Sequence, residues 1–554
     1  MPETLLEAQN FSVRAGDQIL VHPLSFTVQA GETLGIVGES GSGKSLTSLA
    51  IMGLLPPNLR ASGHLLFKAK NLLNLTEDQF GAMRGQQMAM IFQEPMSALN
   101  PSIRCGAQVA EMLRQHTTLK ATARKKKVIA LFEEVELPRA KQMYRAYPHQ
   151  LSGGQKQRVM IAMALACKPK LLIADEPTTA LDVSVQAGIL KLLKKLQQEY
   201  GMALIFISHD LQVVHQVADS ILVLHQGHLK EYASAHTVFN HPQDPYTKGL
   251  LACRPTADSY DKRLPLVRDF LLNENASREV ISPQVKEERT LSRLKQAPLF
   301  EIRNLSKFFQ SAQGLFKSAQ SVAALNQVSL EVYPGESLGL VGESGSGKTT
   351  LGRLLVGLEK ASAGEIFYEK IDLAKASTAQ WRKLHRKIQI IFQDPFASLN
   401  PRMPIGNAIA EVLQVQHKRS SAQAKEEAES LLEKVGLLKE YYGRYPHEFS
   451  GGQRQRIGIA RALAVQPDFI VCDESVSALD VSVQAQILNL LNDLKDEFGF
   501  TYLFISHDLN VVKYFCDRMV VLQDGKVVEA GLAEDVYRQP KQEYTQKLIA
   551  ASQL

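Results

Sequence analysis

Gly38-Glu39-Ser40-Gly41-Ser42-Gly43-Lys44-Ser45 is the stretch that decides the fold, and it recurs as Gly342-Glu343-Ser344-Gly345-Ser346-Gly347-Lys348-Thr349. Each copy fits the pattern G-x-x-x-x-G-K-[ST], a loop that wraps nucleotide phosphates. The glycines leave backbone N–H groups open to an anion, and the lysine adds a positive charge over the outer phosphates. The hydroxyl of Ser45 or Thr349 can hold Mg²⁺. Two copies at matching places predict two nucleoside triphosphate sites.

The repeat extends far beyond these two loops. Four further segments of the first half return in the second with few changes: 91–95 as 391–395, 147–155 as 445–453, 180–182 as 478–480, and 207–210 as 505–508. The spacing between matching residues changes little along the chain, so both halves should share one fold. We therefore expect domains over 1–254 and 299–554. Residues 255–298 are charged and interrupted by prolines, and they form the expected linker.

Composition excludes several classes of function. The 554 residues are 45% hydrophobic and 22% charged, as in an ordinary globular protein. The net charge of +6 is mild, and the one dense basic run, 124–127, is explained by a solvated helix face rather than a nucleic-acid site. Five scattered cysteines offer no zinc or iron–sulfur ligand set and suit a reducing cytosol. With no signal peptide and no apolar run near the ~20 residues of a membrane span, we expect a chain that does not cross the membrane.

Short apolar runs alternate with helical patterns in each half. A strand over 33–37 enters the first phosphate loop, a helix is expected over 45–55, and buried strands over 170–176 and 203–207. Continuous apolar strands separated by helices indicate an α/β fold with a mainly parallel sheet covered on both faces. Ligands bind beyond the carboxyl ends of such strands, where the polar motif residues fall. Sheet-poor, helix-like stretches over 100–165 and 400–464 predict a helical subdomain in each half.

Two neighbouring acids end one buried strand in each half. Asp175 and Asp473 fall where a carboxylate can hold Mg²⁺ directly or through water. Glu176 and Glu474 follow, where a carboxylate can orient or deprotonate an attacking water. Ordinary surface acids are the alternative, but a matching phosphate loop in each half disfavours it.

A glutamine and a histidine complete the polar set of each half. Gln93 and Gln393 follow apolar strands, and their amides can reach a metal ion and its water. His209 and His507 also follow strands, where a histidine can contact the γ-phosphate or the attacking water. Each residue alone is a weak signal, since such side chains usually just hydrogen-bond at the surface. Their registration with the other motifs favours a functional role.

A second anion site is predicted at one helix N-terminus per half. Ser152-Gly153-Gly154-Gln155 and Ser450-Gly451-Gly452-Gln453 open helices expected over 156–166 and 454–464. Serine is a good N-cap, and the exposed N–H groups and the helix dipole favour an anion. A simple cap and turn is the alternative. Because each half already wraps phosphates with its glycine loop, this second site can serve the nucleotide of the other half.

The order of these motifs, twice along nearly the whole chain, resembles that of the ABC ATPases. The Leu-Ser-Gly-Gly-Gln signature is highly specific, although the second copy reads Phe449-Ser450-Gly451-Gly452-Gln453. The resemblance implies two tandem P-loop NTPase domains, each with a mainly parallel sheet, an antiparallel β part and a helical signature subdomain. It also implies ATP and Mg²⁺ as ligands, and two halves that close head to tail on two ATP molecules.

The resemblance divides the site residues between the halves. One site would combine Lys44, Ser45, Gln93, Asp175, Glu176 and His209 with Ser450, Gly452 and Gln453. The other would combine Lys348, Thr349, Gln393, Asp473, Glu474 and His507 with Ser152, Gly154 and Gln155. Covalent linkage makes this pairing intramolecular, so no homodimer is needed.

The segment 241–251, His-Pro-Gln-Asp-Pro-Tyr-Thr-Lys-Gly-Leu-Leu, narrows the family. It is similar to the region that follows the ATPase core in oligopeptide and dipeptide importers, and we expect it over about 235–254. The fused layout is most similar to ATPase subunits of microcin C and peptide importers, and also to those of glutathione importers. The resemblance implies two membrane permeases, an extracytoplasmic binding protein, and a place on the cytoplasmic face of the inner membrane. Peptides, microcin-like compounds, glutathione and nickel all stay open as cargo.

Two positions depart from the family pattern. ABC ATPases stack adenine on an aromatic residue before the phosphate loop; Phe309 fits that place in the second half, but Ala15 stands there in the first. We expect weaker or less base-selective nucleotide binding at the first loop. Ser475 stands where Pro177 follows the glutamate of the first half, and we expect both sites to hydrolyse ATP.

A tandem ABC ATPase that acts on ribosomes without a permease is the alternative function. Such proteins carry a long, strongly helical, charged linker, whereas 255–298 is short and contains prolines. A DNA-repair ATPase would need zinc-binding cysteines that this chain lacks.

Overall fold

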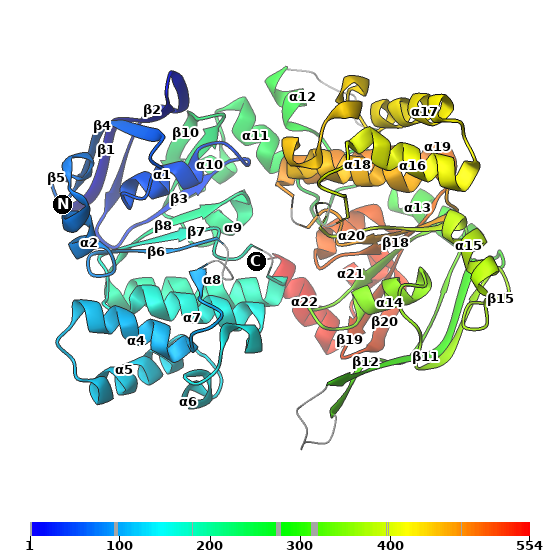
Figure 1. Cartoon of the computed structure of the whole chain (residues 1–554), viewed down its shortest axis with the longest axis horizontal. Helices are drawn as coiled ribbons and strands as arrows, with labels where there is room; N and C mark the ends of the chain where they lie inside the picture. The colour runs from blue at the N-terminus through cyan, green and yellow to red at the C-terminus, as the bar shows by residue number, and fades with distance from the viewer. Residues whose placement is uncertain are drawn as a thin grey trace.

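The computed structural model describes residues 3–93, 98–179, 181–272, 279–311, 320–394, 396, 398–477 and 479–553. Five residues of the repeated motifs lie outside this part of the chain: Glu94, Pro95, Ala180, Pro395 and Ala478. Figure 1 shows two halves side by side, with the N-terminus at the outer edge of the first and the C-terminus between them.

A six-stranded sheet lies at the centre of each half. In the first half its order is β10-β9-β3-β8-β7-β6, and in the second β16-β17-β18-β13-β19-β20. All neighbouring strands are parallel except the β9–β10 and β19–β20 hairpins. The strands are β3 (Thr33–Val37), β6 (Met88–Ile91), β7 (Leu171–Asp175), β8 (Ala203–Ser208), β9 (Ser220–His225) and β10 (His228–Ser234), and β13 (Ser337–Val341), β16 (Ile388–Ile391), β17 (Phe469–Asp473), β18 (Thr501–Ile505), β19 (Arg518–Gln523) and β20 (Lys526–Leu532). The predicted α/β fold with a mainly parallel sheet is confirmed.

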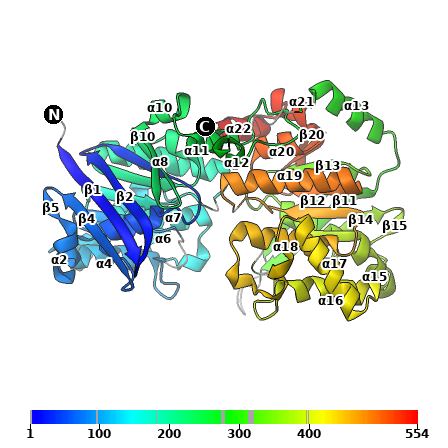
Figure 2. The ribbon, with the colours of Figure 1, turned by 90° about the horizontal axis from the view of Figure 1, so that it is seen from above.

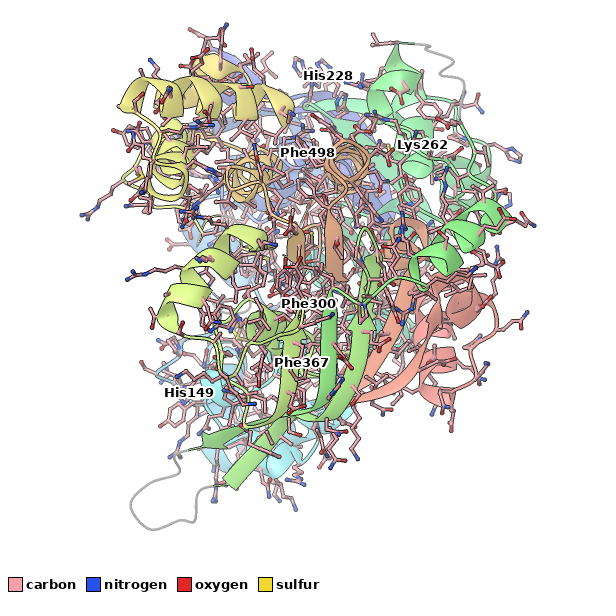
Figure 3. All side chains as sticks on the ribbon, turned by 90° about the vertical axis from the view of Figure 1, so that its right-hand side faces the viewer. His149, His228, Lys262, Phe300, Phe367 and Phe498 are labelled. Atoms are coloured by element: carbon pink, nitrogen blue, oxygen red, sulfur yellow. The ribbon has the colours of Figure 1, made fainter. Side chains whose placement is uncertain are left out.

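An antiparallel sheet packs beside each central sheet. Its order is β2-β1-β4-β5 in the first half and β12-β11-β14-β15 in the second. Figure 3 shows Phe300 and Phe367 on this sheet of the second half, where the Phe300 ring lies 4.6 Å from that of Phe469 in β17. The strands are β1 (Thr4–Ala15), β2 (Gln18–Gln29), β4 (Leu59–Phe67) and β5 (Lys70–Asn71), and β11 (Phe300–Ser311), β12 (Gln320–Val332), β14 (Ala363–Tyr368) and β15 (Ile371–Asp372).

The helix after each phosphate loop is buried between the two sheets. In the first half this helix is α1 (Lys44–Ile51), whose Ala50 and Ile51 join one core with both sheets. It ends four residues earlier than the expected 45–55, because Gly53 turns the chain with φ of 63°. The counterpart is α14 (Lys348–Leu355).

The other helices form a subdomain in each half and cover the sheets. The subdomains hold α4 (Cys105–His116), α5 (Ala121–Glu134), α6 (Ala140–Met143) and α7 (Gly153–Leu165), and α16 (Ile405–His417), α17 (Ser421–Lys434) and α18 (Gly451–Leu463). Outside 255–298, the other helices of the described residues are α2 (Glu77–Met83), α8 (Val183–Tyr200), α9 (Leu211–His215), α10 (Ala235–Asn240), α11 (Pro245–Ala252), α15 (Thr378–Lys387), α19 (Val481–Phe498), α20 (Leu509–Phe515), α21 (Ala533–Arg538) and α22 (Glu543–Gln553). Short 3₁₀ turns lie at Leu72–Asn74, Pro148–Gln150, Lys439–Gly443 and Pro446–Glu448.

The halves are arranged head to tail. Figure 1 places the helical subdomain of the first half (α4, α5) at the bottom and that of the second (α16, α17) at the top. Each C-terminal region crosses over to the other half: α22 packs on α8, and the chain after α11 reaches α19, where the Asn489 side chain bonds both the N–H and the C=O of Leu264 at 2.8 Å.

The stretch 255–298, expected as a linker, contains α12 (Val267–Leu271) and α13 (Pro283–Arg293). Figure 2 shows α13 beside α21 on the outer side of the second half. Lys286 donates to the carbonyls of Lys513 and Tyr514 at 3.2 and 3.0 Å, and Arg293 pairs with Asp517 at 2.9 Å. This stretch is therefore docked on the second half along much of its length.

Candidate functional site

Both phosphate loops have the same local structure. Gly43 and Gly347 take φ of 98° and 105°, and a Cβ there would lie 2.7 Å from the Val21 side chain or 2.4 Å from the Ala324 carbonyl oxygen. Only glycine suits such a position. The ammonium of Lys44 donates to the loop carbonyls of Gly38 and Glu39 at 2.7 and 2.9 Å, and Lys348 repeats this geometry. Burial lowers the pKa of both lysines, although nearby carboxylates oppose the shift.

A hydroxyl and a carboxylate meet below each loop. The Ser45 hydroxyl donates to Asp175 at 3.3 Å, and Thr349 donates to Asp473 at 2.9 Å. Burial raises the pKa of Asp175 to about 6, and it also raises the pKa of Asp473. Within the described residues no group of three or more His, Cys, Asp or Glu could hold a metal ion alone. Mg²⁺ usually takes only one or two protein oxygens and completes its shell with phosphates and water, so these donors fit it.

The predicted glutamine, glutamate and histidine come together in each half. The Gln93 amide donates to Glu176 at 3.0 Å, and His209 Nδ1 lies 3.4 Å from the same carboxylate. In the second half Gln393 donates to Glu474 at 2.9 Å, and His507 lies 3.6 Å from it. In both halves, two residues far apart in sequence, a glutamine and a histidine, therefore contact the carboxylate of one glutamate.

The backbone of both glutamates is left-handed. Glu176 has φ of 47° and Glu474 of 46°, a conformation that costs free energy for a residue with a side chain. Their amides are held by the carbonyls of Ile207 and Ile505 at 3.0 and 3.1 Å. Such strain is characteristic of residues that a fold keeps in one functional orientation.

The electrostatics keep each glutamate ionised. Burial alone would raise the pKa of Glu176, but the hydrogen bond and charge of His209 outweigh burial and lower it. For His209 burial lowers the pKa, and Glu176 outweighs this and raises it. Glu474 and His507 shift in the same directions for the same reasons. A carboxylate that stays ionised is suited to accept a proton.

The two signature segments begin helices, as predicted. Ser152 caps α7 in a capping box: its hydroxyl accepts the Gln155 N–H at 3.4 Å, and the Gln155 side chain accepts the Ser152 N–H at 3.1 Å. Ser450 and Gln453 cap α18 with the same distances. Each helix begins directly after its capping serine, at Gly153 or Gly451. Both therefore start three residues before the expected 156 and 454.

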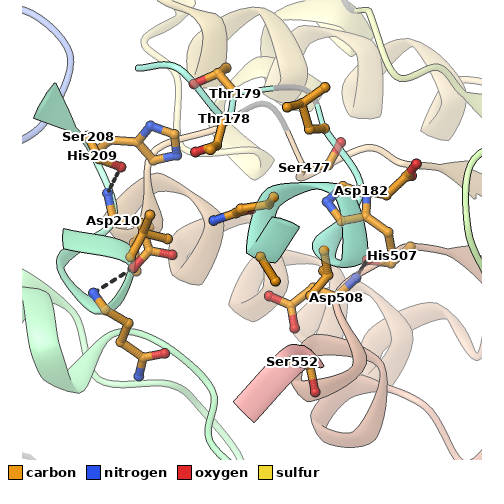
Figure 4. Close-up of a pocket in the computed structure, with 18 of the residues that line it drawn as sticks. Thr178, Thr179, Asp182, Ser208, His209, Asp210, Ser477, His507, Asp508 and Ser552 are labelled. Carbon is orange, nitrogen blue, oxygen red and sulfur yellow. Dashed lines mark hydrogen bonds between the residues drawn. The ribbon is translucent and has the colours of Figure 1, made fainter. Parts of the chain in front are cut away.

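The site extends across the interface between the halves. The N–H of Ser40 donates to Asp480 at 3.0 Å, and Ser482 hydrogen-bonds Glu39, so the first phosphate loop contacts the N-terminus of α19 in the second half. A cavity of about 300 Å³ lies between the halves, lined by Asp182, His209 and Thr349 among others. Figure 4 shows His209 and Asp210 of one half facing this space together with His507 and Asp508 of the other.

A tyrosine outside the predicted site touches each phosphate loop. The N–H of Glu39 donates to the Tyr246 hydroxyl at 3.3 Å, and that of Glu343 donates to Tyr544 at 3.1 Å. Tyr246 is buried and stacks on His225, with ring centroids 4.1 Å apart. The repeat contained a signal for this contact, because Tyr-Thr occurs at matching places in both halves.

The aromatic residue expected over adenine lies near the end of β11. The Phe309 side chain is 42% exposed, and the ammonium of Lys307 lies 4.9 Å from its ring centroid. Ala15 ends β1 opposite Gln18 in the first half. The two halves therefore differ at this position in the manner that the sequence indicates.

Known families and proteins are similar to this chain. The family described as ABC transporter matches residues 21–179 and 325–477, and the family described as oligopeptide/dipeptide transporter, C-terminal region, matches 231–276. The glutathione import ATP-binding protein GsiA of Escherichia coli O6:H1 is 46% identical over 544 residues, covering 96% of this chain and 86% of that protein. GsiA of Pectobacterium atrosepticum is 45% identical over 565 residues, covering 100% and 90%. The dimeric cassette MJ0796 bound to ADP and Pi aligns at 30% identity over 42% of this chain and 98% of its own, with a TM-score of 0.39.

The chain belongs to the ABC transporter ATP-binding family, whose domain it contains twice. More particularly, it is the ATP-binding and ATP-hydrolysing subunit of an importer of the oligopeptide/dipeptide class, and membrane permeases are the partners that this class implies. No helix in the described part of the chain is long and apolar enough to span a membrane.

Proposed function

We propose that this subunit powers the import of peptides or peptide-like compounds, with glutathione the first candidate because the relatives reported above import it. It would lie on the cytoplasmic face of the cell membrane beneath two permease subunits, and an extracytoplasmic binding protein would deliver the cargo. We propose a division into domains over 1–254 and 299–554, joined by 255–298, and the separate sheets of the two halves support it.

Each ATP would lie between the phosphate loop of one half and the signature helix of the other. The backbone N–H groups of 38–45 or 342–349, with the lysine of each loop, would hold the phosphates. Ser450-Gly451-Gly452-Gln453 would face the first loop, and Ser152-Gly153-Gly154-Gln155 the second, each helix offering free N–H groups to the γ-phosphate. Phe309 would stack on the adenine of the second site.

Within each site the glutamate is the proposed general base. Glu176 or Glu474 would accept a proton from the attacking water, while His209 or His507 contacts the γ-phosphate and keeps the glutamate oriented. Gln93 or Gln393, bonded to that glutamate, would position the water. Mg²⁺, when bound by Ser45, Asp175 and Gln93, or by Thr349, Asp473 and Gln393, would neutralise charge on the phosphates.

The contact of Ser40 with Asp480 is the observation that carries this proposal. It joins the first phosphate loop to the second half at one of the loop's own backbone N–H groups. Because one chain holds both halves, their closure is intramolecular and needs no second copy. ATP binding would favour the closed arrangement, and hydrolysis would release it and drive the permeases.

Transport by the reconstituted complex tests this function. The chain, co-expressed with a pair of permeases of the oligopeptide/dipeptide importer class, should co-purify with them and support ATP-dependent uptake of glutathione or short peptides into proteoliposomes. The matched control is the Glu176→Gln, Glu474→Gln variant, which should assemble with the permeases and transport nothing. Co-purification with ribosomes in place of permeases would overturn the proposal and favour the permease-free alternative.

A further inference from the structure

Arg254 connects the two halves at a point that the proposed mechanism does not use. It follows α11, and its guanidinium hydrogen-bonds Asp210 of its own half. Its second terminal nitrogen lies 3.7 Å from the Asp508 carboxylate of the opposite half. The Arg254 side chain is only 17% exposed, and those of the two aspartates 16% and 20%. One cation is thus enclosed between two carboxylates from different halves.

The two aspartates are matching residues of the repeat, and each follows the histidine of its site directly. Asp210 caps α9 by accepting the Gln212 N–H at 2.9 Å, and Asp508 caps α20 by accepting the Asn510 N–H at 2.9 Å. Figure 4 shows both pairs, His209 with Asp210 and His507 with Asp508, at the cavity between the halves. Any shift of either carboxylate therefore moves the turn that holds a histidine of the site.

The cation itself is not repeated. Alignment of 250–254 with 548–552 places Ser552 opposite Arg254, and Ser552 lines the same cavity. Its hydroxyl donates to the Ile549 carbonyl within its own helix. A single guanidinium therefore serves two symmetry-related carboxylates, which would otherwise face each other without an intervening positive charge. The planar, permanently charged fork of arginine suits such a double contact better than lysine.

Arg254 remains charged despite its enclosure. Burial alone would lower its pKa, but the charges of Asp210 and Asp508 outweigh burial and raise it. The bond to Asp210 lies within one half and does not depend on the other. The contact with Asp508 exists only while the halves are together. Closure of the halves therefore links the turn after His209 to the turn after His507 through Arg254.

We propose that Arg254 is a positioning residue that couples the two ATP sites, because it links the turn after His209 to the turn after His507. This inference rests on the proposed ATPase function and adds a physical connection between its two sites. Arg254 would act through the histidine turns rather than as a ligand of either nucleotide. It sets the position of the histidines and, through them, of Glu176 and Glu474.

Turnover of Arg254 variants tests the coupling. In Arg254→Met, kcat for ATP hydrolysis should fall about tenfold, an effect within the range of interaction energies between residues in contact. KM should stay within about twofold of the native value, because the phosphate loops are unchanged. Arg254→Lys, which keeps the charge but reaches one carboxylate at a time, should recover only part of kcat. The matched control is Arg293→Met, which breaks the pair with Asp517 away from the ATP sites and should leave kcat unchanged. Thermal unfolding of all three variants separates loss of fold from loss of coupling.

A double-mutant cycle across the halves isolates the link. Asp508→Asn keeps a good helix cap but removes the charge that Arg254 contacts. It should lower kcat severalfold in the native chain and have no further effect in Arg254→Met. Native-like kcat in a folded Arg254→Met, or equal effects of Asp508→Asn with and without Arg254, would overturn the coupling alone. A native chain without ATP turnover would overturn the proposed function and this inference with it.

Discussion

Replacement of Glu176 and Glu474 together by glutamine is expected to lower ATP turnover by about 10²–10⁴-fold while ATP binding persists. Glutamine has the shape of glutamate, so it keeps the left-handed turn and the contact with Gln93 or Gln393. It cannot accept a proton from water. The lysines and amides proposed to hold the phosphates are untouched, so the affinity for ATP should change little.

The measurement pairs steady-state ATP hydrolysis with equilibrium ATP binding on the same variant. Glu77→Gln is the matched control, because this carboxylate is 76% exposed and pairs with Arg84 away from both loops. Its turnover should equal that of the native chain. Near-normal hydrolysis by the double variant would rule out the glutamates as general bases, and loss of binding would show that they hold the nucleotide instead.

The second phosphate loop is expected to bind ATP about 5- to 150-fold more tightly than the first. Stacking of a base on an aromatic ring contributes about 1–3 kcal/mol, and Phe309 offers such a ring where the first half has Ala15. The exposed face of Phe309 is free for this contact, since 42% of the side chain is accessible. The first site lacks this contribution.

Two single-site variants measure this difference. Lys44→Ala weakens the first site, so ATP binding reports the affinity of the second. Lys348→Ala weakens the second site, so ATP binding reports the affinity of the first. Phe309→Ala should remove the advantage of the second site, and Ala15→Phe should strengthen the first. Equal ATP affinities of the two single-site variants would refute the assignment of Phe309 to the adenine.

Much of the fold follows from local patterns in the sequence. The strands β3, β7 and β8 were predictable because each is a continuous apolar run that ends at a polar motif. The convergence of Gln93, Glu176 and His209 was also predictable, since residues at the carboxyl ends of parallel strands meet at one edge of the sheet. The repeat strengthened each expectation by presenting it twice.

Contacts between distant segments could not be predicted in this way. The helix α12 has only 5 residues and α13 is mostly polar, so the placement of this stretch depends on tertiary partners such as Asp517 and Asn489. Arg254 carries no signal in the sequence, because its counterpart is Ser552 and no repeat marks it. The roles of such residues depend on contacts that form only when the two halves pack together.

The central claim is that each nucleotide is held between opposite halves, and a substitution at Gly451 can test it. Gly451 is exposed at the start of α18, and the nearest atom to an added Cβ would be the Leu479 side chain at 3.7 Å, so the fold has room for a side chain. A glutamate there would repel phosphates at the signature helix. Gly153→Glu is the matched variant in the first half.

The most direct measurement is the number of ATP molecules that each chain retains in a background carrying Glu176→Gln and Glu474→Gln, where we expect two. In this background Gly451→Glu is combined with either Lys44→Ala or Lys348→Ala. We predict one ATP with Lys44→Ala, because both changes affect the same site, and none with Lys348→Ala, because they affect different sites. The opposite pattern, none with Lys44→Ala and one with Lys348→Ala, would mean that each nucleotide is enclosed within a single half and would contradict the account.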